Sequence, residues 1–78
     1  MNLLRFKVLV EWDPEGQVWV TYVPDLNWLS TYGDTREEAM ERTREAILGY
    51  LGAAEKEGLP LPAPQHGPEL VEIEVTAP

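Results

Sequence analysis

"VPDLNWLSTYGDTREEAM" (residues 23–40) contains the signals at which a β-sheet should give way to a helix. Pro24 has no backbone donor and should end the strand before it. Gly33 and Asp34 form a turn signal. Thr35, followed three residues later by Glu38, is the pattern of a capping box at a helix N-terminus. The stretch therefore predicts a strand, a turn, a short third strand over about residues 29–32, and then a helix.

The helix is expected over about residues 35–57. Its start is the capping box, and Gly58 is a stop signal. Glu38 and Arg42 are four residues apart and should pair on the solvent side. One helical face carries the side chains expected to pack on the sheet: Ala39, Thr43, Ala46, Ile47, Tyr50, Leu51 and Ala54.

A β-hairpin is expected before this stretch, with strands over about residues 3–12 and 17–23. Apolar side chains occupy every second position of the first strand from Leu4 to Trp12, which indicates one buried face. The second strand is rich in β-branched and aromatic residues. "DPEG" (13–16) supplies the turn, with Pro14 at its second position and Gly16 free to take a positive φ.

The register of this hairpin has two alternatives, which bury opposite faces of the second strand. A four-residue loop sets Trp12 opposite Gln17 and buries Trp19 and Val23. A five-residue loop sets Trp12 opposite Val18 and buries Val18, Val20 and Tyr22. We favour the five-residue loop because it keeps Gln17 and the polar Thr21 out of the core.

The C-terminal part begins with a proline-rich connector (residues 59–68), which should be extended. "LVEIEV" (70–75) alternates apolar and acidic residues and predicts a closing strand beside the first. The expectation is one α+β domain over residues 1–78. Its order is β-β-β-α-β, with a four-stranded sheet and one long helix on one face.

The bulk composition limits the kinds of partner. The chain has 78 residues, a net charge of −8 and no cysteine. So small a core favours self-association, most simply as a symmetric dimer. Its face is expected on the sheet side away from the helix, at Leu3, Leu9, Trp19 and Val23. The acidic charge argues against direct nucleic-acid binding. No stretch is long enough to cross a membrane, and a cytoplasmic location is expected.

No set of residues predicts an active site. His66 is the single histidine and lies in a loop rich in Pro and Gly. No potential nucleophile has an evident activating base. Asp13, Asp25, Asp34 and Glu38 are candidates for metal-assisted hydrolysis, but most of them already have turn or capping roles. We therefore expect a protein that is not an enzyme and that has no cofactor and no metal.

The longer stretch "VPDLNWLSTYGDTREEAMERTREAILGYL" (23–51) resembles the HicB antitoxin family. In that family a hairpin strand runs into Pro-Asp-Leu, then a threonine before Gly-Asp-Thr, then Glu-Glu-Ala and an amphipathic helix. Asn27, Trp28 and Leu29 stand where the family usually has Pro-Gly-Cys. The matching residues are Pro24, Asp25, Leu26, Thr31, Gly33, Asp34, Thr35, Glu37, Glu38 and Ala39.

The resemblance implies a fold like a partial ribonuclease H without that enzyme's active site. It also implies a small RNA-cleaving toxin of the HicA kind as partner, whose basic surface would suit the −8 charge. Many family members carry a DNA-binding segment after the last strand, where this chain has Ala77 and Pro78, so operator binding is not expected. The alternative function is a stand-alone oligomeric binding or structural protein of the same fold.

The expected partner surface lies in the opening stretch. We expect Asp25, Trp28, Tyr32 and Asp34 to form it, because exposed aromatics beside acids suit a basic protein. An equally open alternative is that Trp28 packs over the end of the helix near Tyr50.

Overall fold

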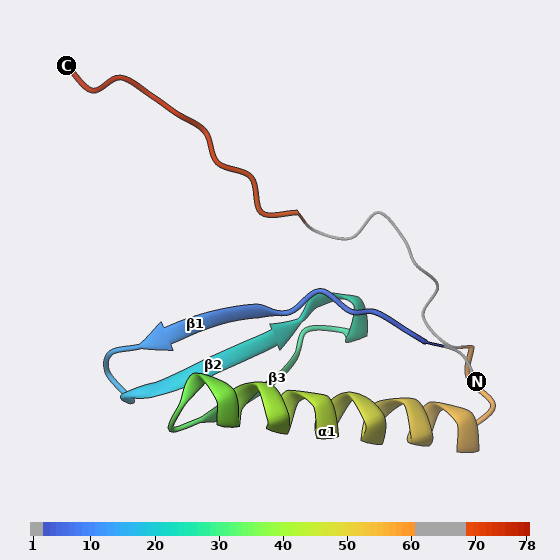
Figure 1. Cartoon of the computed structure of the whole chain (residues 1–78). Helices are drawn as coiled ribbons and strands as arrows, with labels where there is room; N and C mark the ends of the chain where they lie inside the picture. The colour runs from blue at the N-terminus through green and yellow to red at the C-terminus, as the bar shows by residue number, and fades with distance from the viewer. Residues whose placement is uncertain (1–2, 61–68) are drawn as a thin grey trace.

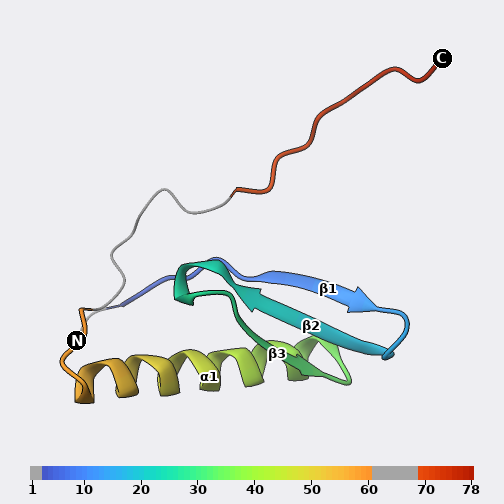
Figure 2. The same cartoon turned by 180° about the vertical axis from the view of Figure 1, so that it is seen from behind.

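The computed structural model describes residues 3–60 and 69–78, and they form a sheet with a long helix against one face (Figures 1 and 2). Both strand pairs are antiparallel, in the order β1-β2-β3. The elements are β1 (Leu9–Asp13), β2 (Val18–Val23), the 3-10 helix η1 (Pro24–Leu26), β3 (Leu29–Gly33) and α1 (Arg36–Lys56).

The expected four-stranded sheet is wrong: the described residues form a three-stranded sheet. β1 begins at Leu9, not near residue 3, and residues 70–75 are extended without strand pairing. In Figure 1 the segment that contains them runs away from the sheet. The physical reason is that an alternating pattern shows that a segment can cover a core, but not which strand edge it pairs with. The expected connector, residues 59–68, lies outside the described residues except for Leu59 and Pro60.

The hairpin register also differs from the favoured one. Trp12 lies opposite Trp19, and Asp13 opposite Val18, which leaves a four-residue turn at residues 14–17. Asp13 Oδ1 accepts a hydrogen bond of 3.0 Å from the Glu15 backbone N–H, and this bond holds the start of the turn. The positive φ falls at Gln17 (53°) and not at the expected Gly16. The local turn signals in the sequence therefore did not fix the register.

The change of register reverses the two faces of β2. Thr21 and Val23 are both 0% exposed on the side of α1, whereas Val20 and Tyr22 are partly exposed on the other side. The Thr21 and Thr43 hydroxyl oxygens are 2.5 Å apart, and Thr43 donates its proton to the Ala39 carbonyl at 2.7 Å. Because each hydroxyl has one proton, Thr21 then donates to Thr43, and the Thr31 carbonyl at 3.4 Å is a longer alternative acceptor for it. This pair lets a polar residue lie in the core without an unsatisfied group.

The helix α1 confirms the expected start and end within one residue. Thr35 Oγ1 accepts a 3.0 Å hydrogen bond from the Glu38 backbone N–H. At the other end, Gly58 has φ 71°, and the Leu59 N–H donates to the Ala54 carbonyl at 2.9 Å, which is a Schellman motif. The predicted pair on the first turn is present, with 2.8 Å between Arg42 Nη2 and Glu38 Oε1.

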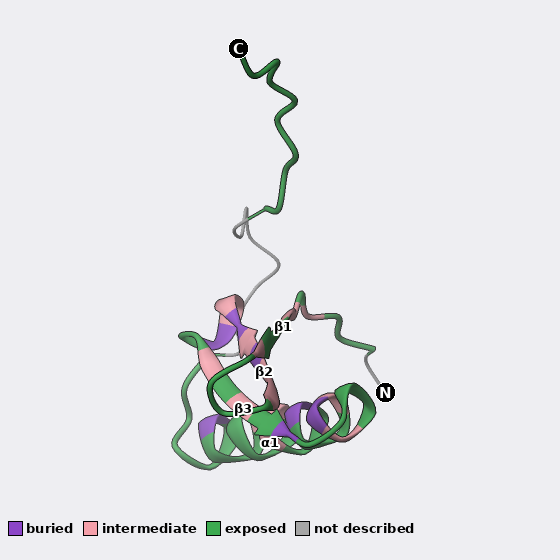
Figure 3. Cartoon of the chain, turned by 90° about the vertical axis from the view of Figure 1, so that its left-hand side faces the viewer, coloured by how far each residue is buried: buried purple, intermediate pink, exposed green. Residues whose placement is uncertain are grey.

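The core lies between β2, β3 and α1, and it is small (Figure 3). Gly33 allows the helix to approach β3, because a Cβ at this position would be 2.5 Å from the Ala39 backbone nitrogen. The expected helical face is confirmed at Ala39, Thr43 and Ala54, which are buried. Among the described residues, the buried side chains are Thr21, Val23, Leu26, Ala39, Thr43 and Ala54.

Candidate partner-binding surface

A tight turn between η1 and β3 presents Trp28. Leu26 is 1% exposed and ties η1 to the core. The next two residues, Asn27 and Trp28, are both in the left-handed region, with φ of 59° and 60°. Asn is among the residues that tolerate this conformation, whereas a bulky side chain is rare there. The turn therefore holds Trp28 in a conformation that costs free energy. Such conformations are common at functional sites.

Trp28 lies on the face of the sheet away from α1. Its side chain is 52% exposed, and its ring meets that of Tyr22 edge to face, with 6.5 Å between centroids. The alternative position near Tyr50 is wrong. Tyr50 lines a separate hollow at the end of the helix with residues of α1 and with Leu59 and Pro60. Trp28 is therefore half open to solvent, as expected for a contact residue.

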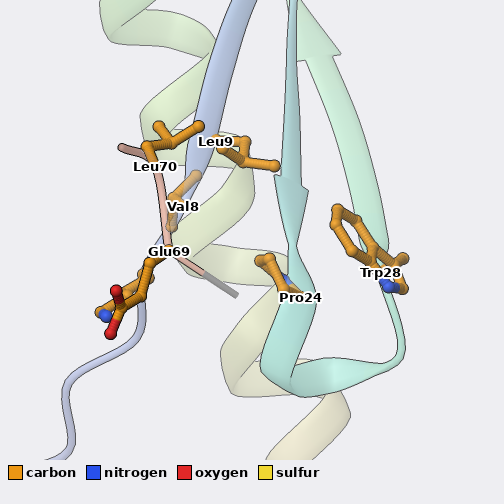
Figure 4. Close-up of a pocket in the computed structure, with 7 residues that line it drawn as sticks. Val8, Leu9, Pro24, Trp28, Glu69 and Leu70 are labelled. Atoms are coloured by element: carbon orange, nitrogen blue, oxygen red, sulfur yellow. The ribbon is translucent and has the colours of Figure 1, made fainter. Parts of the chain in front are cut away.

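An apolar groove of about 710 Å³ extends from Trp28 to the N-terminal side of β1 (Figure 4). A second hollow of about 450 Å³ continues it past Leu9 to Tyr22. Figure 4 shows Pro24 between Trp28 and the Val8–Leu9 side of the groove. We call this surface the Trp28 groove; it is lined by Lys7, Val8, Leu9, Pro24, Trp28, Glu69 and Leu70.

The four residues of the expected partner surface fall into two separate places. Asp25 and Trp28 lie before β3, whereas Tyr32 and Asp34 lie at its far end. Tyr32 lies four positions after Trp28, which is roughly 13 Å along the strand. Tyr32 is 57% exposed, and the Arg42 guanidinium lies 5.8 Å from its ring centroid. The structure therefore joins Tyr32 to the helix and not to the Trp28 groove.

The four residues of the expected oligomer face also do not share a face. Leu9 lines the Trp28 groove, and Leu3 is 82% exposed in the residues before β1. Trp19 packs against Trp12 at 5.5 Å between centroids, on the same side of β2 as the buried Val23. Trp19 and Val23 lie on the α1 side because the observed register buries Thr21, which the favoured register kept out of the core. Tyr22, expected in the core, contributes instead to the open face.

The described residues offer binding groups and no evident reaction centre. Within residues 3–60 and 69–78, no group of three or more His, Cys, Asp or Glu side chains is placed to hold a metal ion. His66 lies outside these ranges. No helix in the described part of the chain is long and apolar enough to cross a bilayer. What the surface can do chemically is to bind an apolar or aromatic group through the Trp28 groove.

These features define a small α+β domain, with a helix on one sheet face and an apolar groove on the other. The family model described as "HicB_like antitoxin of bacterial toxin-antitoxin system" matches residues 6–74, nearly the whole chain. The chain belongs to this family, which confirms the resemblance seen in residues 23–51. Membership implies a regulatory and not a catalytic role. No curated protein and no solved structure matches the chain.

Proposed function

We propose that this protein masks a small basic RNA-cleaving toxin of the HicA kind, in the cytoplasm, and that it is not itself an enzyme. The observation that carries the proposal is Trp28, which is half exposed at φ 60° on the rim of an apolar groove. Family membership supplies the toxin as a partner class.

The backbone at Trp28 supports a contact role. A bulky side chain with a left-handed backbone costs on the order of 1–3 kcal/mol, and such conformations gather at ligand and partner sites. The family usually has Gly at this point of the pattern, and Gly would adopt the same φ without strain. Trp28 fits the turn poorly and stays half exposed. Binding of a partner by its ring therefore explains a Trp at this position better than a contribution to folding stability does. Trp is also among the residues that most often dominate interfaces.

Charge supports a basic partner. The chain has fourteen acidic and six basic residues. Asp25 lies in η1, three residues before Trp28, so an acid accompanies the aromatic side chain. A surface that normally receives RNA phosphates is basic, and an acidic protein is steered toward it and can cover it. We expect such binding to weaken as salt is raised.

The test compares Trp28→Gly with Leu48→Ala. Both side chains are more than half exposed, but Leu48 lies on α1 away from the Trp28 groove. Binding to the product of the neighbouring reading frame is measured by calorimetry. Trp28→Gly should weaken binding by about tenfold or more, as loss of a hot-spot Trp does. Leu48→Ala should leave binding unchanged.

The free energy of unfolding separates an interface role from a core role. Trp28→Gly removes backbone strain and should keep or raise the stability, although it also removes the contact with Tyr22. Lost binding at unchanged stability supports the proposal. A large loss of stability with binding retained would mean that Trp28 acts as a packing residue.

The alternative function is a stand-alone oligomeric binding protein of the same fold. The exposed apolar side chains of residues 69–75 favour self-association, which we propose in either case. The two functions predict different products of the neighbouring reading frame. A small basic chain encoded there that binds this protein favours the masking function, and a pure homo-oligomer with no such neighbour favours the alternative.

A further inference from the structure

The C-terminal segment (residues 69–78) has the pattern of a strand without a partner. It is extended and exposed along its length. Val71, Ile73 and Val75 alternate with Glu72 and Glu74, so one face would be apolar and the other acidic. The three apolar side chains are 71%, 82% and 80% exposed. Large aliphatic side chains in that pattern, left in water, indicate a surface that another element covers.

The outer edge of β1 is a matching acceptor. The sheet order leaves one side of β1 without a neighbouring strand in the described chain. Residues 3–8 continue the chain toward β1 and are not paired as a strand. An unpaired edge offers a row of backbone N–H and C=O groups to an added strand. Residues 69–75 are long enough to cover residues 5–7 and their neighbours on this edge.

Charge restricts where the C-terminal segment can dock on this edge. Arg5 and Lys7 are the basic residues among residues 3–33, and both are exposed. They are two residues apart, as are Glu72 and Glu74, so two cross-strand ion pairs can form. At the other end of β1, Glu11 and Asp13 would repel the same acids. The favoured register therefore places the segment beside residues 5–7.

The same register places the apolar side chains correctly. When residues 5–8 continue β1 as a strand, Arg5 and Lys7 share the face of Leu9, away from α1, because Val10 is the partner of the core residue Thr21. When Glu72 and Glu74 lie beside the two cations, Val71, Ile73 and Val75 lie on the α1 side. There they would cover Phe6, which is only half-buried, and Leu4, which is 45% exposed.

We propose that the C-terminal segment of one chain docks beside residues 5–7 of a second copy, and that the two copies exchange these segments reciprocally. In this structure Leu70 lines the Trp28 groove, and the segment then leaves its own sheet. The radius of gyration is 15.3 Å, against about 11.5 Å for a compact domain of this length. Reciprocal exchange is a symmetric contact that satisfies both edges at once. It deepens the self-association proposed above and does not depend on a toxin.

The test uses the full chain, which has no native cysteine. Lys7→Cys and Glu74→Cys variants are mixed and treated with a short bismaleimide, and a Lys7→Cys with Glu72→Cys mixture is run beside it. The control mixes Lys7→Cys with Glu45→Cys, an exposed position on α1. Mass spectrometry counts linked heterodimers. One of the first two mixtures should exceed the control by about tenfold or more, because docking raises the effective concentration of the thiols.

Three outcomes would overturn the exchange. Yields equal to the control mean that the segment docks elsewhere or not at all. A chain with both Lys7→Cys and Glu74→Cys that gives mainly an internally linked monomer means docking within one chain. Sedimentation of the unmodified protein as a monomer at tens of micromolar also contradicts it. Circular dichroism checks that each variant keeps the fold, which is expected because the substituted side chains are exposed.

A charge reversal gives an independent measurement. Lys7→Glu should weaken dimerisation by a factor of about two to five for each docked segment, the size of one cross-strand ion pair. Adding Glu74→Lys or Glu72→Lys should restore it, and the partner that does so identifies the strand direction. If neither acid restores dimerisation, the proposed register is wrong.

Discussion

Two regions of this chain have similar alternating patterns and very different surroundings. In β2, Thr21 and Val23 are both 0% exposed, because α1 covers that face and Thr43 supplies a hydrogen-bond partner. In the C-terminal segment, Val71, Ile73 and Val75 are at least 71% exposed. β2 even contains a polar residue on its buried side, whereas the exposed segment carries only aliphatic ones there.

The difference shows that burial depends on the neighbours of a strand and not on its hydrophobicity alone. β2 has a strand on each side and a helix above it, so its backbone and side chains are both satisfied. Within the described residues, the C-terminal segment has no strand paired with it and no helix against it.

Gly33→Ala should have the largest effect. The added Cβ would lie 2.5 Å from the Ala39 backbone nitrogen and 2.9 Å from its Cα. Because both atoms belong to the helix backbone, α1 must shift, and the free energy of unfolding should fall by about 3 kcal/mol. Urea unfolding measures it. Gly49→Ala is the matched control: its Cβ meets nothing within 4 Å, and it should raise helix stability by about 0.5–1 kcal/mol.

Thr43→Val should have the next largest effect. It keeps the side-chain shape but removes the acceptor of the Thr21 hydroxyl inside the core. The free energy of unfolding should fall by about 1–2 kcal/mol, the cost of a buried polar group left poorly paired. Replacing Thr21 by Val as well should recover most of the loss. A double variant less stable than either single one would show that the hydroxyl pair does not act as a unit.

Thr35→Ala should cost about 1 kcal/mol, because Thr35 Oγ1 caps the first turn of α1 through the Glu38 N–H. Thermal melting at matched protein concentration measures the change. Thr35→Ser keeps the acceptor oxygen and serves as the control. Equal losses in the two variants would mean that Thr35 contributes through its methyl group and not through the cap.

Val71→Ala should have the smallest effect, below about 0.5 kcal/mol, when measured at a dilution where the chain is monomeric. Val23→Ala is the matched substitution in the packed region and should cost about 2 kcal/mol. Equal costs at both positions would remove the contrast between the two regions. A Val71→Ala effect that grows with protein concentration would instead agree with segment exchange.

Much of the packed region was predictable from local signals. The helix boundaries follow from Thr35 and Gly58, whose roles depend on residues within one turn. Part of the helical face that meets the sheet was also predictable, because the buried Ala39, Thr43 and Ala54 recur at helical spacing. These features depend on sequence neighbours, so the sequence contains the information they need. The partial exposure of Trp28 was one of two alternatives that the sequence left open.

The rest needed contacts between residues far apart in the chain. The hairpin register depends on Thr21 finding Thr43, 22 residues away, and polarity alone argued against it. The candidate partner surface divides because β3 separates Trp28 from Tyr32. The Trp28 groove combines residues 7–9, Pro24, Trp28 and residues 69–70, and no local pattern relates these segments.

By itself, the sequence determined the family, the helix with its two ends, the acidic charge and the strand-forming pattern of residues 70–75. The tertiary structure decided which face of β2 is buried, where Trp28 lies, and that the C-terminal segment has no strand partner within the described chain. The physical reason is the range of the interactions. Caps, turns and periodicity act within a few residues, whereas a strand edge and a buried hydroxyl acquire their energies from partners that only the folded chain brings together.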